Sequence, residues 1–74
     1  MIQIKTHKRI RDLRQERHLK QCDLAKLMNV TAAVICHWEN DRSRPDLDSL
    51  AELAEIFHTT TDYLIGLTDE RERR

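Results

Sequence analysis

The sequence predicts a small all-α domain in which five helices pack compactly. Three observations predict this fold class. A chain of 74 residues has room for one domain. Its single Gly and single Pro leave few positions that would break a helix. Its apolar residues recur every three or four positions, and no segment alternates as a half-buried strand would. We place the domain at residues 1–68 and interpret the all-charged residues 69–74 as a frayed C-terminal tail.

The first three helices are expected at residues 6–17, 21–28 and 32–40. Each has an apolar face at helical spacing, formed by Ile10 and Leu13, by Leu24, Ala25 and Met28, and by Ile35 and Trp38. Thr31 is of a residue type that is preferred at N-caps, so we expect it to cap the third helix.

A fourth helix is expected directly after Pro45, with Asp46 as its N-cap. Asp48 lies in its first turn, where a carboxylate suits the helix dipole. Its apolar stripe consists of Leu50, Leu53, Ala54 and Phe57. A short fifth helix should begin after Thr60 and end at Gly66, because Gly commonly follows a helix C-terminus.

The connections support these boundaries. Only residues 29–31 separate the second and third helices, a short turn typical of a helix-turn-helix unit. Tight exits from helices favour positive φ, which Gly adopts most easily and which Asn, Asp and His tolerate best among the other residues. Residues of these tolerant types follow four of the expected helices: His18, Asn29, Asp41 and His58. We therefore expect positive φ at all four positions.

The charge is distributed unevenly, although the net charge is zero. Residues 1–44 contain ten Lys or Arg against five Asp or Glu, a balance of +5. Residues 45–74 contain three against eight, a balance of −5. A polyanion is therefore expected to dock on the N-terminal half.

Composition argues against several functional classes. No apolar run is long enough for a signal peptide or a membrane span, so we expect a cytoplasmic chain without a membrane partner. Cys22 and Cys36 lack the spacing of a zinc site, so we expect reduced thiols and no metal or cofactor, while redox sensing stays open. The sequence has no Gly-rich phosphate loop and too little chain to enclose a small-molecule substrate, so an enzyme is not expected.

Five pieces of sequence occur in a fixed order along the chain. They are Leu19-Lys20-Gln21-Cys22-Asp23-Leu24-Ala25, Met28-Asn29-Val30-Thr31, Ile35 with Trp38-Glu39-Asn40, Pro45-x-Leu47-x-x-Leu50, and Asp62-Tyr63-Leu64-Ile65-Gly66. In order and spacing they resemble the Cro/repressor-type (Xre-like) helix-turn-helix domains of phages and bacteria, over roughly residues 7–67. The resemblance implies a sequence-specific regulator of transcription. Such a regulator would bind double-stranded operator DNA, usually as a homodimeric repressor on a palindromic site.

The resemblance also implies roles for individual residues. The outward positions of the third helix would face the bases of the major groove, and they are Ala32, Ala33, Cys36 and His37. The residues implied to bind backbone phosphates are Lys20, Gln21, Thr31, Asn40, Arg42 and Arg44. Arg14 and Glu39 occupy positions where many members of the family place a partly buried ion pair.

A homodimer interface is expected in and just after the fifth helix. Its candidate residues are Tyr63, Ile65 and Leu67. Leu64 should point into the core, which leaves Ile65 directed outward without an obvious partner in the same chain. Dimerisation only on DNA is equally compatible with this sequence.

The groove-facing positions depart from the family's pattern. Ala32 and Ala33 can contact a thymine methyl group but cannot form the bidentate hydrogen bonds that Arg and Gln make to bases. We therefore expect recognition to be weighted toward A·T-rich sequence, phosphate contacts and DNA shape, with His37 as the one polar side chain facing the bases.

Two alternatives stay open. The same fold could serve as a protein-interaction module, antitoxin-like or a bridging factor, with weak or no DNA binding. The basic residues of the first helix region could form a solvated face, or some of them could lie near phosphates. These residues are Lys5, Lys8, Arg9, Arg11, Arg14 and Arg17.

Overall fold

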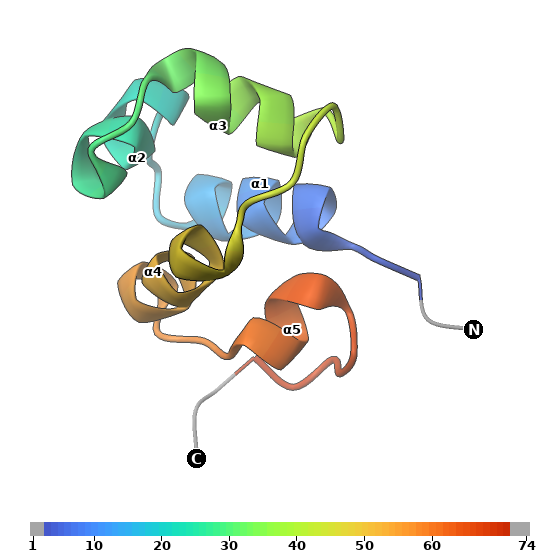
Figure 1. The fold of residues 1–74 in the computed structure, drawn as a ribbon. Coiled ribbons are helices and arrows are strands. Elements are labelled where there is room, and N and C mark those ends of the chain that lie inside the picture. The colour runs from blue at the N-terminus through green and yellow to red at the C-terminus, as the bar shows by residue number, and fades with distance from the viewer. Residues whose placement is uncertain (1–2, 72–74) are drawn as a thin grey trace.

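The computed structural model describes residues 3–71, and within that range it contains five α-helices and no strand (Figure 1). The helices are α1 (Thr6–Glu16), α2 (Gln21–Met28), α3 (Ala32–Glu39), α4 (Leu47–Phe57) and α5 (Thr61–Ile65). The all-α, five-helix prediction is confirmed. Helices α1 and α3 each end one residue before the predicted boundary.

Side chains and backbone groups cap the helix starts in different ways. The Asp46 carboxylate accepts a hydrogen bond from the backbone N of Ser49 (2.8 Å). The hydroxyl of Thr60 accepts one from the backbone N of Tyr63 (3.1 Å). Thr31 occupies the N-cap position of α3 with an extended backbone, but its side chain makes no capping hydrogen bond. The position predicted for Thr31 is thus right, whereas the capping bond is absent.

The helix exits have the predicted backbone conformation. His18, Asn29, Asp41 and His58 adopt φ values of 56°, 58°, 58° and 56°. Gly66 follows α5 with φ 99°, and a Cβ atom at this position would lie 2.6 Å from the carbonyl oxygen of Gln3. Gly66 is therefore required for two reasons. Its backbone is left-handed, and the N-terminal segment passes directly over it.

Each helix contributes one fully buried aliphatic side chain to the core. These side chains have a relative exposure of 0 % and are Ile10, Leu24, Ile35, Leu53 and Leu64. Trp38 and Phe57 are the largest apolar side chains that belong to the same cluster. Each such residue contributes roughly 1.5–3 kcal/mol through burial of apolar surface. Because helices this short are only marginally stable in isolation, all five depend on the shared core.

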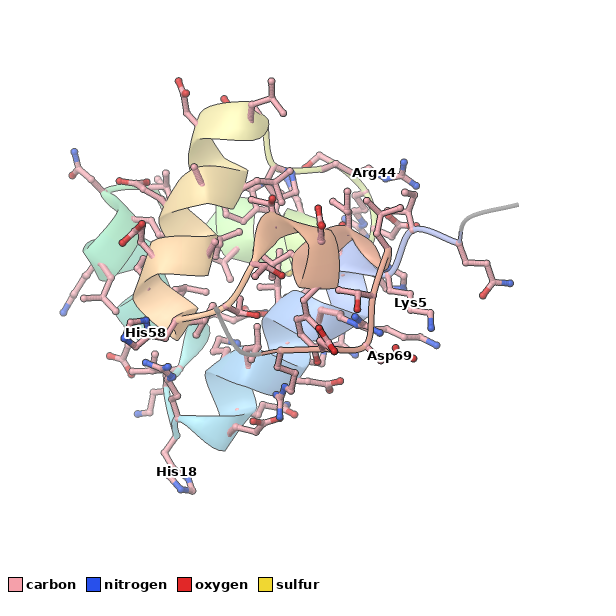
Figure 2. All side chains as sticks on the ribbon, turned by 90° about the horizontal axis from the view of Figure 1, so that it is seen from below. Lys5, His18, Arg44, His58 and Asp69 are labelled. Carbon is pink, nitrogen blue, oxygen red and sulfur yellow. The ribbon has the colours of Figure 1, made fainter. Side chains whose placement is uncertain are left out.

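The described C-terminal residues, up to Arg71, pack against the domain, whereas the sequence predicted a frayed tail from residue 69 onward. One guanidinium nitrogen of Arg9, Nη1, donates to the carbonyl oxygens of Tyr63 (2.8 Å) and Thr68 (2.6 Å). Its Nη2 pairs with the carboxylate of Asp69 at 2.7 Å. Figure 2 shows the segment that leads to Asp69 running beside α1. Residues 72–74 lie outside the described residues.

None of the helices in residues 3–71 has the length and apolar character needed to cross a membrane.

Candidate nucleic-acid interface

The outward face of α3 is open to solvent. Ala32, Ala33 and His37 are exposed, and Cys36 is half-buried. Ile35 and Trp38 on the opposite face are 0 % and 6 % exposed and anchor the helix in the core. Figure 1 shows α3 at an outer edge of the molecule, next to α2 and over α1. The residues expected to face bases therefore lie together on one accessible helix face.

The turn between α2 and α3 fixes the angle at which α3 is presented. After α2 the backbone of Asn29 is left-handed, and the backbone N of Val30 donates to the carbonyl oxygen of Ala25 (3.0 Å). This pattern of hydrogen bonds satisfies carbonyl groups that the helix end would otherwise leave free. The chain then turns within three residues, so α3 packs closely against α2.

Glu39, at the end of α3, is the centre of a buried polar network. It is 2 % exposed, and its carboxylate accepts hydrogen bonds from Arg14 Nε (2.6 Å) and Arg14 Nη2 (2.9 Å). The hydrogen bonds to Glu39 raise the pKa of the Arg14 guanidinium above its already high ordinary value. Arg14 Nη1 also donates to the carbonyl oxygen of Leu19 (2.8 Å), in the turn before α2. One ion pair thus joins α1, the following turn and α3.

Gln21, expected to bind phosphate, is part of this network. Its Nε2 donates to Glu39 Oε1 at 3.2 Å, so the start of α2 is tied to the end of α3. An amide nitrogen carries two hydrogens, and one of them remains for a second acceptor. Lys20 and Thr31, the other phosphate candidates near α2 and α3, are exposed.

The loop after α3 contains the remaining phosphate candidates. Arg42 and Arg44 are exposed, and Figure 2 shows Arg44 pointing away from the body of the domain. The Nε of Arg44 lies 3.6 Å from the carboxylate of Asp41. Asn40 instead turns back onto α3, where its Nδ2 donates to the carbonyl oxygen of Cys36 (2.9 Å) and to its Sγ (3.3 Å). All three candidates are exposed, but the Asn40 amide is already engaged with Cys36.

Basic residues of α1 and of its C-cap support the fold instead of forming a free basic face. Arg9 is 8 % exposed and binds the C-terminal segment. Arg17 donates to the carbonyl oxygens of Ile56 (3.0 Å) and Phe57 (2.9 Å), at the C-terminal end of α4. A cation at this end of a helix also suits the helix dipole. Arg9, Arg14 and Arg17 therefore all make hydrogen bonds within the domain, an assignment that charge counting along the sequence could not make.

The predicted dimer residues differ in their availability. Tyr63 is 8 % exposed, because its ring is covered by the Arg9 guanidinium at 4.0 Å from the ring centroid. Ile65 is half-buried, whereas Leu67 is 50 % exposed. A further apolar residue, Ile4, is 37 % exposed on the N-terminal segment that passes over Gly66. No helical periodicity marks this segment, so nothing in the sequence connected it with α5.

The cysteines do not suggest a metal site. Cys22 is exposed, Cys36 is half-buried, and both are free thiols. Across residues 3–71, no three His, Cys, Asp or Glu side chains gather in a way that could hold a metal ion.

Comparison with known proteins identifies the family to which a chain with this arrangement belongs. The helix-turn-helix family model matches residues 10–64, which is most of the chain and includes α2, the turn and α3. The chain belongs to the helix-turn-helix family. The resemblance recognised in the sequence is thereby confirmed.

Individual members of the family are similar to the chain over most of its length. The HTH-type transcriptional regulator ImmR of Bacillus subtilis is 32 % identical over 59 residues, covering 80 % of this chain and 46 % of ImmR. The uncharacterized HTH-type transcriptional regulator YobD of the same organism is 32 % identical over 62 residues, covering 84 % of this chain and 55 % of YobD. The chain thus spans about half the length of these relatives.

Solved structures have the same fold. The P22 c2 repressor, crystallised in complex with a synthetic operator, superposes with a TM-score of 0.77 at 28 % identity, covering 81 % of this chain and 91 % of that one. A transcriptional regulator from Listeria innocua superposes with a TM-score of 0.85 at 29 % identity, covering 99 % of this chain and 68 % of that one.

Proposed function

We propose that the chain binds double-stranded DNA and regulates transcription, acting as a repressor. The observation that carries the proposal is the open outer face of α3, held at a fixed angle by the turn after α2 and flanked by the exposed Arg42 and Arg44. A helix presented in this way fits the major groove of B-DNA. The likeness to a repressor crystallised with an operator supports the same conclusion.

In this proposal, the surface provides more phosphate contacts than base contacts. Phosphates are bound at the start of α2 by Lys20 and Gln21, before α3 by Thr31, and in the loop after α3 by Asn40, Arg42 and Arg44. Asn40 contributes once its amide leaves Cys36. Bases meet Ala32, Ala33, Cys36 and His37, of which only His37 offers a strong hydrogen bond. We expect a preference for A·T-rich sites and for DNA shape over strict base identity.

We further propose that the chain acts as a homodimer on a palindromic operator in the cytoplasm. One module can contact only a half-site, and two-fold pairing would place two α3 helices about 34 Å apart, one turn of DNA. The candidate interface is the surface of Ile65 and Leu67, with a marginal part for the covered Tyr63. Sedimentation of the unaltered protein and of Ile65→Asp tests this interface. If the interface is correct, the variant sediments with a lower molecular mass than the unaltered protein.

Selection of binding sites from random duplex DNA tests the function as a whole. The expected result is a bound, A·T-rich half-site, with two copies separated by one helical turn. Affinity for the selected site should fall steeply as salt rises, because each phosphate contact releases counterions. Strict G·C positions beneath α3 would contradict the proposed mode of recognition.

The competing function is a protein-interaction module with the same fold. The feature that favours it is the pair Ala32 and Ala33 at groove-facing positions, since neither can make a polar base contact. Absence of duplex binding even at low salt would establish this alternative and reject DNA regulation.

A further inference from the structure

Arg11, a basic residue of α1, contacts both the backbone and the side chain of Glu39. Its Nη2 donates to the backbone carbonyl oxygen of Glu39 (3.1 Å), the last residue of α3. Its Nε lies 3.6 Å from the Glu39 carboxylate. A carbonyl in the last turn of a helix has no partner within the helix, so Arg11 fills a position that would otherwise need water. Arg11 therefore fixes the end of α3 from a neighbouring helix.

Unlike Arg9 and Arg14, Arg11 remains open to solvent. Its side chain is 45 % exposed, against 10 % for Arg9 and 12 % for Arg14. A guanidinium has five donor hydrogens, and Glu39 engages only one edge of this one. Within the described part of the chain, Arg11 Nη1 donates no hydrogen bond. The outer edge of Arg11 is therefore free to meet a ligand.

The ligand that approaches this point is defined by the neighbouring residues. The Glu39 carbonyl group held by Arg11 is joined directly to Asn40, where the loop containing Arg42 and Arg44 begins. Figure 1 shows this end of α3 above the N-terminal half of α1. A DNA strand bound along that loop would present a phosphate oxygen next to the exposed edge of Arg11. Guanidinium and phosphate suit each other because two parallel N–H donors can meet two oxygens.

We propose that Arg11 is a DNA-phosphate ligand, positioned by Glu39, at the C-terminal end of α3. The inner edge of its guanidinium holds α3, and its outer edge binds the phosphate. Contact with the DNA and support of the α3 helix are thus combined in one side chain. This inference rests on the proposed DNA-binding function and adds to it a contact from α1.

The test compares the salt dependence of duplex binding for the unaltered chain, Arg11→Gln and Lys26→Gln. Lys26 is an exposed residue of α2 outside the proposed interface, so its replacement removes the same charge elsewhere. Removing one phosphate ligand from each protomer should lower the slope of log K against log salt by about 0.9 per protomer bound, so for each protomer the variant loses about threefold less affinity than the unaltered chain between 50 and 200 mM salt. Lys26→Gln should leave the slope nearly unchanged.

A purely structural Arg11 would give a different result. Arg11→Gln would then lower the melting temperature, and its salt slope would equal that of the unaltered chain, which overturns the proposal. If Arg11→Gln does not fold, the guanidinium NMR signal of Arg11 in the unaltered protein decides. A shift on adding duplex supports the contact, and an unchanged signal overturns it. Absence of any duplex binding by the unaltered chain would reject the DNA-binding function and this contact together.

Discussion

The inner and outer sides of the helix-turn-helix unit use the same kinds of residue in opposite ways. On the inner side, Arg14 is bound to the buried Glu39 by two hydrogen bonds of 2.6 and 2.9 Å. On the outer side, Arg42 is exposed, and Arg44 has only a 3.6 Å contact with Asp41. The inner charges are fully engaged and set the geometry of α3, whereas the outer charges remain available for a ligand.

This difference shows how a small domain can present a helix rigidly and still leave cations free. A buried charge without a partner is costly, so each inner charge has hydrogen-bonding partners and little freedom to move. An exposed ion pair is worth at most about 1 kcal/mol, so the outer arginines can exchange Asp41 for another anion at little cost. Mutations should therefore divide into those that change stability and those that change binding.

The largest effect is expected from Glu39→Gln, which removes the inner carboxylate. The Glu39 carboxylate accepts hydrogen bonds from Arg14 and Gln21 and lies beside Arg11. Without this carboxylate, Arg14 would remain as a buried, unpaired cation. Breaking such a pair from one side costs about 3–5 kcal/mol in the free energy of unfolding. Chemical denaturation measures this loss.

Replacing both members of the pair provides the matched control. The double variant Arg14→Met with Glu39→Leu removes both charges and restores apolar volume, so it should be less destabilised than Glu39→Gln. A double variant that is as unstable as Glu39→Gln would show that the pair matters through shape rather than through charge.

A smaller effect, confined to binding, is expected from Arg42→Gln combined with Arg44→Gln. Both side chains are exposed, so stability should change by no more than about 0.5 kcal/mol. The salt slope for duplex binding should fall by about 0.9 for each phosphate that the variant no longer neutralises. A lowered melting temperature with an unchanged slope would place these arginines with the inner group and remove the contrast between the two sides.

Asp41→Asn should raise duplex affinity. The carboxylate of Asp41 lies 3.6 Å from Arg44 Nε and would itself face DNA phosphates, so removing its charge frees Arg44 and relieves repulsion. Asn is the suitable replacement, because the backbone at this position has φ 58° and Asn tolerates that conformation. The expected gain is roughly two- to fivefold at low salt.

The control for Asp41→Asn removes one negative charge from α4. Asp48→Asn alters an exposed residue away from the proposed interface and should change affinity less than Asp41→Asn does. Equal gains from the two variants would mean that overall charge, and not the contact with Arg44, sets the affinity.

The sequence predicted local features of this fold well, because they depend on single residues. Positive φ after four helices followed from the residue types His, Asn and Asp at the exits, and the cap of α4 followed from Asp46 after Pro45. The core residues followed from helical spacing, with the exception of Leu50, which is only half-buried.

Contacts between distant segments were less accessible. Nothing in the sequence shows that Arg9 reaches Asp69, sixty positions away, or that Arg17 caps the end of α4. Such pairings depend on how the helices pack, and a long arginine side chain can serve either solvent or a distant carbonyl group. For the same reason, the tie between Gln21 and Glu39 and the double contact of Arg11 appear only in three dimensions.

The smallest effect is expected where the outer loop ends, at the Asp46 cap of α4. The backbone N–H of Ser49 donates to the Asp46 carboxylate and lowers its pKa in the folded chain. A lowered folded pKa stabilises the fold at pH values above the unfolded pKa of about 3.9, and this contribution is lost as pH falls through the folded value. Asp46→Ala should thus reduce stability at neutral pH and remove this part of the acid dependence below about pH 4.

Urea denaturation at pH 7 and pH 3 measures the free energy of unfolding under both conditions. If the variant and the unaltered chain differ in this free energy by the same amount at the two pH values, the cap acts without its charge. Because Asp46 lies outside the Glu39 network, Asp46→Ala should leave the hydrogen bonds that hold α3 intact, while the start of α4 loosens where the loop containing Arg42 and Arg44 ends.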